Sequence, residues 1–315
     1  MKTHRSYRDL APEDRGAAVA IGNFDGVHLG HQSVLALARA AAAELDAPFG
    51  VVTFEPHPRA FFAPDAPPFR LMSASSRARR LARLGVEQLY ELPFDAALAG
   101  LPPEAFVRAV LAGGLGIRHL VAGADFRFGK GRAGDADTLR ALGPGLGFGV
   151  SVAPLVSDDQ GRHSSSAIRR ALTDGQPEAA ARVLGHWHRI EGRVMHGDRR
   201  GRELGFPTAN LALDGLHLPR FGVYAVLVDV LGGPHRGRHA GVASIGVRPT
   251  FGVNPPNLEV HLLDFDGDLY GEEVSVALVA FQRPEARFDS AEALVAAMQA
   301  DTAEARRRLA PLMAK

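Results

Sequence analysis

One short stretch constrains the fold of this chain more than any other: residues 22–31, which read Gly-Asn-Phe-Asp-Gly-Val-His-Leu-Gly-His. An apolar run at 18–21 precedes it, and an alanine- and leucine-rich run at 33–45 follows it. The order of strand, glycine-rich turn and helix leaves unpaired backbone N–H groups at the positive end of a helix dipole, where an anion can bind. His28 and His31 add imidazoles that can stabilise charge developing on a phosphoryl oxygen. The stretch therefore indicates phosphate chemistry on a nucleotide.

Strand and helix patterns alternate along the first part of the chain, up to about residue 185. This alternation predicts right-handed βαβ units and a parallel sheet, with ligands bound at the carboxyl ends of its strands. The polar residues 1–17 are predicted to be peripheral, and the proline-rich residues 59–72 to form a loop over a pocket. The predicted strands are 18–24, 50–54, 86–92, 119–123 and 150–156, and the predicted helices are 30–45, 77–84, 103–111 and 176–184.

The pattern changes near Trp187, where helical periodicity gives way to short β-branched runs separated by glycine and proline. Such runs predict a small closed antiparallel β-barrel, and one helix at 290–312 follows it. The sequence thus predicts two domains, residues 1–185 and residues 186–315. The strands expected in the second domain are 189–195, 222–230, 239–246, 258–265 and 273–281.

Composition narrows the function classes. The chain has 315 residues, 46% of them hydrophobic and 23% charged, with a net charge of +1, so no overall field favours nucleic acid or a membrane surface. It has no cysteine, which excludes disulfides, a thiol nucleophile and a cysteine zinc site. No apolar run is long enough to span a membrane, and the polar N-terminus lacks a signal-peptide core. We expect a cytoplasmic protein with neither a nucleic-acid nor a membrane partner.

Four further segments place polar groups at the ends of predicted elements. Residues 55–58, Glu-Pro-His-Pro, form a stiff exit from a strand, and residues 124–134 mix glycine, aromatic and basic residues after another strand. Residues 163–169 put three serines and an arginine at a helix start, which suits phosphate but also suits simple capping. Residues 196–210 form a basic, glycine-punctuated turn that can close over phosphates or be an ordinary hairpin turn.

Together these segments resemble one family, the bifunctional riboflavin kinase/FAD synthetases of bacteria. The matching strings are G-x-F-D-G-x-H-x-G-H at 22–31, T-F-x-P-H-P at 53–58, S-S-x-x-I-R at 164–169, G-R-x-L-G-F-P-T-A-N at 201–210 and E-x-H-L-L-D-F at 259–265. The likeness extends from about residue 18 to about residue 310. Three positions depart from the family pattern: His163 stands where an apolar residue is common, Ser166 where threonine is usual, and Ser244 where asparagine is usual.

For residues 1–185 the resemblance implies a Rossmann-like nucleotidyltransferase domain that transfers AMP from ATP to FMN, giving FAD and pyrophosphate. His28 and His31 are the implied catalytic residues, and Phe128 is expected near the nucleotide. The implied nucleotide-binding residues are Gly22, Phe24, Asp25, Gly30, Asp125, Ser164, Ser165 and Arg169, and the implied flavin-binding residues are Pro56, His57 and Pro58.

For residues 186–315 the resemblance implies a riboflavin kinase, in which Glu259 takes the proton of the ribityl 5′-hydroxyl as that oxygen attacks the γ-phosphate of ATP. Thr208 and Asn210 are implied to hold the Mg²⁺ of ATP, since neutral oxygens suit that ion. Gly197, Gly201 and Arg202 are implied to bind nucleotide, and Arg283, in an Arg-Pro-Glu string, is implied to line the flavin site.

Two alternatives stay open on the sequence alone. The N-terminal domain can lack FMN adenylylation or adenylylate another acceptor, which leaves a riboflavin kinase. The chain can also be a flavin-binding carrier or sensor without chemistry, although such a protein has no use for a Mg²⁺ site beside a base. Formation of FAD would exclude the first alternative. Consumption of ATP in the presence of riboflavin would exclude the second. The sequence leaves the oligomeric state open, a homo-oligomer included.

Overall fold

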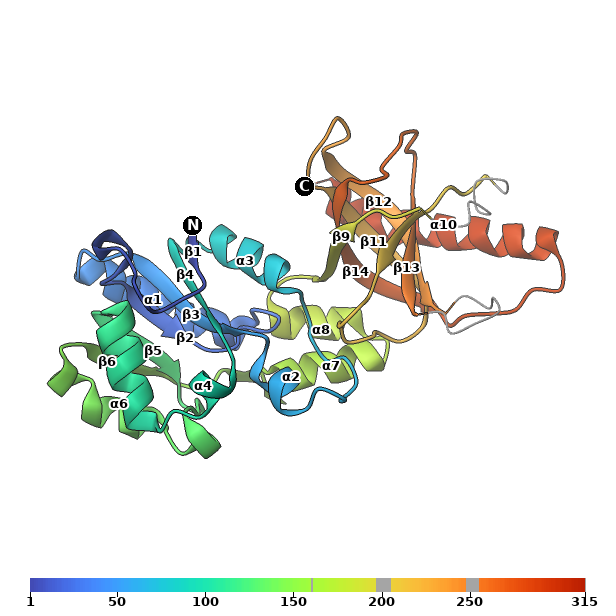
Figure 1. The fold of residues 1–315 in the computed structure, drawn as a ribbon. Helices are drawn as coiled ribbons and strands as arrows, with labels where there is room; N and C mark the ends of the chain where they lie inside the picture. The colour runs from blue at the N-terminus through green and yellow to red at the C-terminus, as the bar shows by residue number, and fades with distance from the viewer. Residues whose placement is uncertain (160, 197–204, 248–254, 315) are drawn as a thin grey trace. The chain divides into compact units, whose positions relative to one another are not determined.

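A computed structural model describes residues 1–159, 161–196, 205–247 and 255–314 (Figure 1). The chain forms two compact units. The first unit contains residues 1–67 and 74–164, and the second contains residues 68–73 and 165–315. Each unit has its own sheet and its own apolar core.

The first unit is built on a six-stranded sheet in which every neighbouring pair of strands is parallel. Its predicted class, α/β with a parallel sheet, is confirmed. Because the strands are parallel, their carboxyl ends meet at one edge of the sheet. In spatial order the strands are β1 (Lys2–His4), β4 (Gln88–Pro93), β3 (Phe49–Glu55), β2 (Ala18–Ile21), β5 (His119–Gly123) and β6 (Gly149–Ala153).

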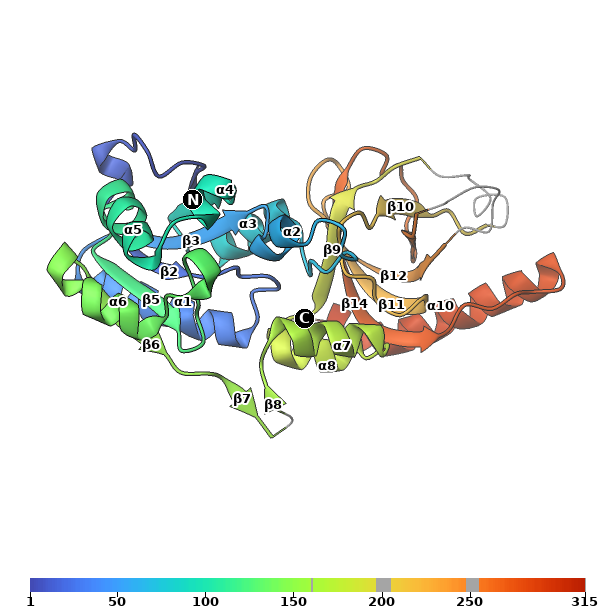
Figure 2. The ribbon, with the colours of Figure 1, turned by 60° about the horizontal axis from the view of Figure 1, so that its bottom comes forward.

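Helices pack against this sheet and cover its apolar strands (Figure 1). β2 and β3 read as continuous apolar runs because both of their faces are buried. A two-stranded hairpin, β7 (Ser157–Asp158) and β8 (Gly161–Arg162), comes late in the unit (Figure 2). The helices are α1 (Leu29–Glu44), α2 (Pro58–Phe62), α3 (Ala74–Arg83), α4 (Ala96–Ala99), α5 (Pro103–Ala105) with its π-helical continuation Phe106–Leu115, and α6 (Ala136–Leu142).

Two expectations for this unit were wrong. Residues 1–17 are not peripheral, because β1 is an edge strand of the sheet and Asp14 is buried, with its side chain accepting from Lys2 Nζ at 2.6 Å. The Tyr90 hydroxyl also donates to the Asp14 carbonyl at 2.7 Å. The segment 59–72 is not simply a loop, since it starts within the short helix α2. In both places the structure comes from tertiary contacts that a polar or proline-rich sequence does not reveal.

The second unit contains an antiparallel sheet that curls almost into a barrel, as predicted. An isolated bridge between Met195 and Asn210 links its two edges. The strand at 209–212 was not expected. In spatial order the strands are β10 (Ala209–Ala212), β13 (Asn257–Leu262), β12 (Gly237–Gly246), β11 (Gly222–Val230), β14 (Glu273–Arg283) and β9 (His188–Arg193).

Two apolar layers hold this unit together. Alternate residues of β11, such as Tyr224 and Val226, point into the barrel core, while Ala225 and Leu227 on the other face pack under α10 (Ala291–Met313). α10 contributes Ala305 and Leu309 to that second layer. Burial of both faces explains why β11 is apolar throughout.

Helices α7 (Ser165–Thr173) and α8 (Pro177–Leu184) lie side by side and belong to the second unit (Figure 2). A small core that includes Leu71, Ile168 and Leu184 joins them to residues 68–73. The compact units therefore divide after residue 164. That each activity resides within 1–185 or 186–315 stays a prediction.

The α10 layer predicts the effect of a truncation at its centre. Leu309 is fully buried, so Leu309→Ala is expected to lower the free energy of unfolding of the second unit by about 2–5 kcal/mol through lost burial and a residual cavity. Met313→Ala, at a position of the same helix that is 42% exposed, is the control and is expected to cost less than about 1 kcal/mol. Urea unfolding followed by the fluorescence of Trp187, the chain's single tryptophan, measures the effect, because that ring packs against the same layer. Equal midpoints for both variants would contradict the packing role of Leu309.

Candidate functional site

The turn between β2 and α1 has an unusual backbone. Phe24, Gly26 and Val27 all have positive φ angles, at 51°, 88° and 46°. Residues other than glycine rarely adopt this backbone conformation. Phe24 and Val27 are nevertheless buried, and the Gly22 N–H donates to the Val52 carbonyl of β3 at 3.1 Å. Packing therefore holds this turn in a strained conformation, which is a feature of ligand sites.

His28 caps the helix that follows the turn. It is the N-cap of α1, and its Nδ1 accepts the backbone N–H of His31 at 3.2 Å. A nitrogen that accepts a hydrogen bond carries no proton, so the proton of the neutral His28 ring lies on Nε2. The His28 and His31 rings stack with 3.6 Å between centroids and 22° between planes. The two predicted catalytic residues thus form one aromatic pair at a helix N-terminus.

His31 is held as a neutral ring. Burial lowers its pKa well below the usual value for histidine, and the neighbouring His28 adds to that effect. Its Nδ1 is buried, and among the described residues it has no hydrogen-bond partner. A neutral imidazole can donate or accept a hydrogen bond, so the pair offers directional groups to a phosphate instead of a fixed charge.

Glycine at position 30 suits a place where little room is left for a side chain. A Cβ there would lie 3.1 Å from the His28 ring and 3.3 Å from the His163 carbonyl oxygen. His163, one of the departures from the family pattern, is itself buried, and its Nε2 lies 2.9 Å from Asp158 Oδ2. The glycine lets the helix start fit between the His28 ring and the segment that ends at Ser164.

Other predicted residues of this unit follow neighbouring strands of the sheet. His57 lies two residues after the end of β3, is buried and caps α2, with its Nδ1 accepting from the Arg59 N–H at 3.0 Å. Pro58 is the first residue of α2. Asp125 follows β5 and forms an ion pair with Arg162. Since β2, β3 and β5 are parallel, these segments leave the sheet at the same edge as the histidine pair.

Three residues that the sequence predicts near the nucleotide do not lie simply at this edge of the first sheet. Phe128 lies in the apolar core of the first unit and packs against Phe106, with 5.6 Å between ring centroids. Ser165 and Arg169 belong to the second unit. There Arg169 Nε donates to the Phe69 carbonyl at 2.6 Å, and the guanidinium lies 5.4 Å from the centre of the Phe69 ring. Phosphate binding by Ser164, Ser165 and Arg169 stays a prediction.

In the second unit, a row of polar residues crosses three strands. Asn210 on β10 is paired with Glu259 on β13, and Glu259 is paired with Ser244 on β12. The adjacent residues on these strands, such as Leu258 and Val260, point into the barrel core. Because side chains alternate along a strand, the polar row faces away from that core. The strand register thus brings the predicted base next to a predicted Mg²⁺ ligand.

Asn257 links these two residues and was missed by the sequence analysis. Its Nδ2 donates to Asn210 Oδ1 at 3.3 Å and to Glu259 Oε1 at 3.1 Å. The only signal in the sequence is its spacing, two residues before Glu259 in a strand, which puts both side chains on one face. Asn257 orients the amide and the carboxylate toward each other.

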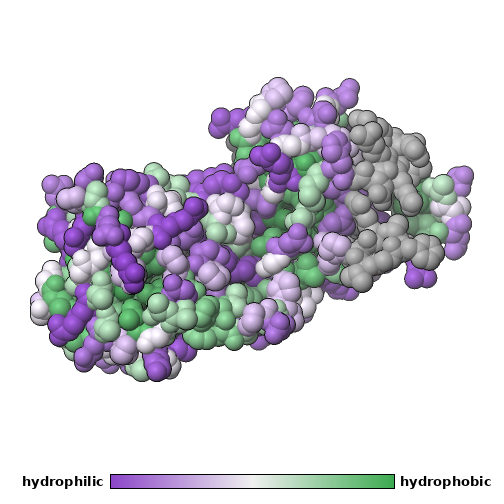
Figure 3. Space-filling model, in the orientation of Figure 1, coloured by the Kyte–Doolittle hydropathy of each residue, from purple (hydrophilic) through white to green (hydrophobic). Residues whose placement is uncertain are grey.

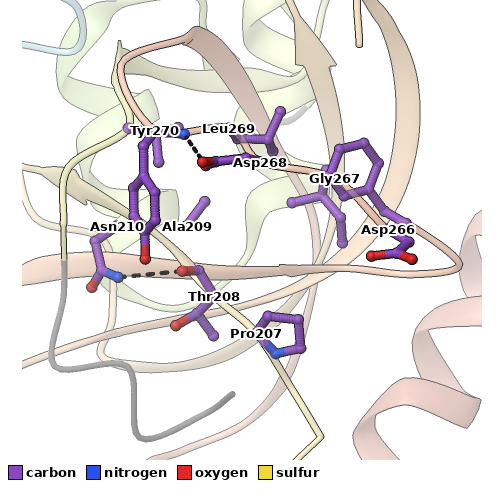
Figure 4. Close-up of a pocket in the computed structure, with 12 residues that line it drawn as sticks. Pro207, Thr208, Ala209, Asn210, Asp266, Gly267, Asp268, Leu269 and Tyr270 are labelled. Carbon is purple, nitrogen blue, oxygen red and sulfur yellow. Dashed lines mark hydrogen bonds between the residues drawn. The ribbon is translucent and has the colours of Figure 1, made fainter.

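A cavity lies beside this row (Figure 4). Thr208 and Asn210 line it, and the Asn210 amide donates to the Thr208 carbonyl at 3.5 Å. Asp266 and Asp268 add carboxylates, and Tyr270 adds an aromatic ring next to Asn210. Hydroxyl, amide and carboxylate oxygens are the ligands that Mg²⁺ prefers, so the residues present fit that ion. Neither aspartate was expected at the site from the sequence.

The structure says less about the other residues that were predicted to bind ligands in this unit. The Arg283 guanidinium forms a bidentate ion pair with Asp301 of α10, with its Nη2 2.7 Å from Asp301 Oδ2. Its flavin contact stays a prediction. Gly197, Gly201 and Arg202 lie outside the described residues.

These features define a class of protein: a two-unit nucleotide-dependent transferase with a nucleotidyltransferase-like parallel sheet and a near-barrel carrying a polar row. A family model described as FAD synthetase matches residues 10–167, and one described as riboflavin kinase matches residues 184–309. The chain belongs to the family of bifunctional riboflavin kinase/FMN adenylyltransferases.

Relatives of that name match over nearly the whole chain. The one from Pseudomonas fluorescens is 46% identical and covers 99% of both chains, and the one from Escherichia coli K12 is 41% identical and covers 97% of both. A crystal structure from Streptococcus pneumoniae, titled as a macrolide-efflux protein, has a TM-score of 0.84 at 34% identity and covers 97% of this chain and 98% of that one. In the part of this chain that the structure describes, no helix is long and apolar enough to cross a membrane. The face in Figure 3 mixes polar and apolar side chains.

The lowered pKa of His31 predicts how stability depends on pH. Below about pH 6.5 the unfolded chain binds a proton at residue 31 that the folded chain does not, so this residue costs stability as the pH falls. Between pH 7.5 and pH 5.5 we therefore expect this group to lower the free energy of unfolding. Urea unfolding followed by circular dichroism at both pH values measures it, with His31→Asn as the matched variant. The same pH dependence in His31→Asn and in wild type would contradict this assignment.

Proposed function

We propose that the second unit phosphorylates riboflavin with ATP to give FMN, and that the first unit adenylylates FMN with ATP to give FAD and pyrophosphate. Family membership supports both activities. The observation that carries the proposal is the presence, in one chain, of the stacked His28–His31 pair at a helix N-terminus and the Asn210–Glu259 row beside a cavity whose lining includes Thr208, Asp266 and Asp268. We also propose a cytoplasmic location, where ATP is supplied.

In the adenylylation step, an oxygen of the FMN phosphate attacks the α-phosphorus of ATP, and pyrophosphate leaves. That phosphate is already ionised at pH 7, so the site needs positioning and charge stabilisation more than a base. His28 donates from Nε2 to the phosphoryl oxygen on which charge develops, since its Nδ1 is occupied by the His31 N–H. The positive end of the α1 helix dipole supports the same charge.

In the kinase step, the 5′-hydroxyl of riboflavin attacks the γ-phosphorus of ATP, and ADP leaves. Glu259 accepts the hydroxyl proton, and Asn257 holds its carboxylate in place. Thr208 and Asn210 would hold Mg²⁺, which supplies charge neutralisation for the phosphates when it is bound. Asn257 also orients Asn210, so one amide aligns the base and the candidate metal ligand.

A time course of flavin products tests the proposal directly. The purified chain is incubated with riboflavin, ATP and Mg²⁺, and the flavins are separated by chromatography. We expect FMN to rise first and then to convert into FAD. Accumulation of FMN without FAD would remove the adenylylation step, and unchanged riboflavin retained by the protein would indicate a flavin carrier.

Two reciprocal variants test whether the reactions use separate sites. His28→Ala is expected to lower the rate of FAD formation from FMN by about 100- to 1,000-fold, the usual cost of losing one donor to a developing oxyanion, and to leave FMN formation within about twofold. Glu259→Gln is expected to lower FMN formation by about 100-fold or more and to spare FAD formation from supplied FMN. Each variant is the control for the other. Equal loss of both activities in either variant would contradict two separate sites.

A further inference from the structure

Arg77 of α3 is a fully buried charged side chain, with 0% of its surface exposed. Its Nη2 donates to Glu55 Oε2 at 3.0 Å and to Glu91 Oε2 at 2.9 Å. Its Nη1 donates to the backbone carbonyl of Asn23 at 3.2 Å. One guanidinium therefore joins three segments of the first unit.

Two of those segments carry residues of the first site. Asn23 lies in the strained turn that leads to His28. Glu55 is the last residue of β3 and directly precedes the segment Pro56-His57-Pro58. The Thr53 hydroxyl donates to the same Asn23 carbonyl at 3.3 Å, so two side chains hold one backbone oxygen of the turn.

The third acceptor is not needed to balance charge. A buried guanidinium must be paired, and the carboxylates of Glu55 and Glu91 already supply two negative charges. The bond to the Asn23 carbonyl adds nothing to that balance, but it fixes where the turn lies relative to β3. The planar fork of arginine can hold all three acceptors at once, which the single ammonium group of lysine cannot do in the same geometry.

We propose that Arg77 is a positioning residue for FMN adenylylation, which holds the His28 turn and the Pro56–Pro58 segment in their working arrangement. This inference rests on the function proposed above for the first unit. Arg77 acts only through the residues it holds. A displacement of about 1 Å in a catalytic group can lower a rate by about 100-fold, so loss of this arrangement is expected to appear in catalysis as well as in stability.

The test compares variants that weaken the hold on Asn23 without leaving a buried carboxylate unpaired. Arg77→Lys keeps the charge and loses the fork, and Thr53→Val removes the second donor with little change of volume. We expect kcat for FAD formation from FMN to fall about 10- to 100-fold in Arg77→Lys and about 3- to 10-fold in Thr53→Val. The KM for ATP should change by less than about threefold, because His28 acts mainly in the transition state. The KM for FMN should rise in Arg77→Lys, because Arg77 also holds Glu55 and the segment Pro56–Pro58 that follows it.

The matched control is Asp14→Asn, which weakens another ionic contact of the same unit, the pair between the buried carboxylate of Asp14 and the exposed ammonium group of Lys2. It is expected to lower the midpoint of urea unfolding and to leave kcat for FAD formation unchanged. Riboflavin phosphorylation, measured on the same samples, should stay within about twofold in every variant because its site lies in the second unit. Far-ultraviolet circular dichroism of each variant then reports whether the first unit is folded.

The outcomes separate this inference from the function on which it rests. Unchanged kcat in both Arg77→Lys and Thr53→Val, in a chain whose wild type makes FAD, would overturn the positioning role and leave the proposed function intact. A wild-type chain that makes no FAD would overturn the proposed function, and the positioning role with it. A fall in kcat in these variants, with Asp14→Asn unchanged, supports the role.

Discussion

The first unit depends on a turn that its own sequence would not hold in place. Phe24 and Val27 adopt left-handed backbone conformations, and such residues cost about 1–3 kcal/mol each unless their surroundings fix them. Here the surroundings are the sheet: the buried rings and methyl groups, the Gly22 N–H bonded to β3, and the Asn23 carbonyl held by Thr53. The positions of both histidines follow from that turn, so the pairing of β2 with β3 is a condition for the site.

The two candidate sites are built in different ways, and this decides what sequence reasoning can find. His28, His31 and Gly30 are neighbours in the chain, and a strand, a turn and a helix can be read locally. Asn210 and Glu259 are far apart in the chain and meet only because the β10–β13 register places them opposite each other. The register depends on the whole barrel, so the role of Glu259 came from family resemblance alone.

The elements of the fold were predictable where burial of one or both faces of a strand or helix leaves a periodic pattern of apolar residues in the sequence. The strand 222–230 was predicted with its observed bounds, and the helix predicted at 290–312 is observed as α10. β1 and β10 were missed because they are short and carry little apolar pattern; pairing with longer neighbours makes them strands. Likewise, the sequence around α3 is rich in arginine, and nothing in it indicates that Arg77 is buried while Arg79 and Arg80 are not.

The first unit buries two kinds of basic group, and chemistry dictates their different treatment. An imidazole can lose its proton on burial, so His31 becomes neutral and needs no counter-charge. A guanidinium cannot, so Arg77 remains charged and requires Glu55 and Glu91. The fixed positive charge is thereby neutralised beside the turn, and the turn itself presents neutral donors. In the anion site that we propose, hydrogen-bond direction then matters more than net charge. The backbone position of Asn23, which Arg77 and Thr53 hold, is therefore expected to affect how the site works.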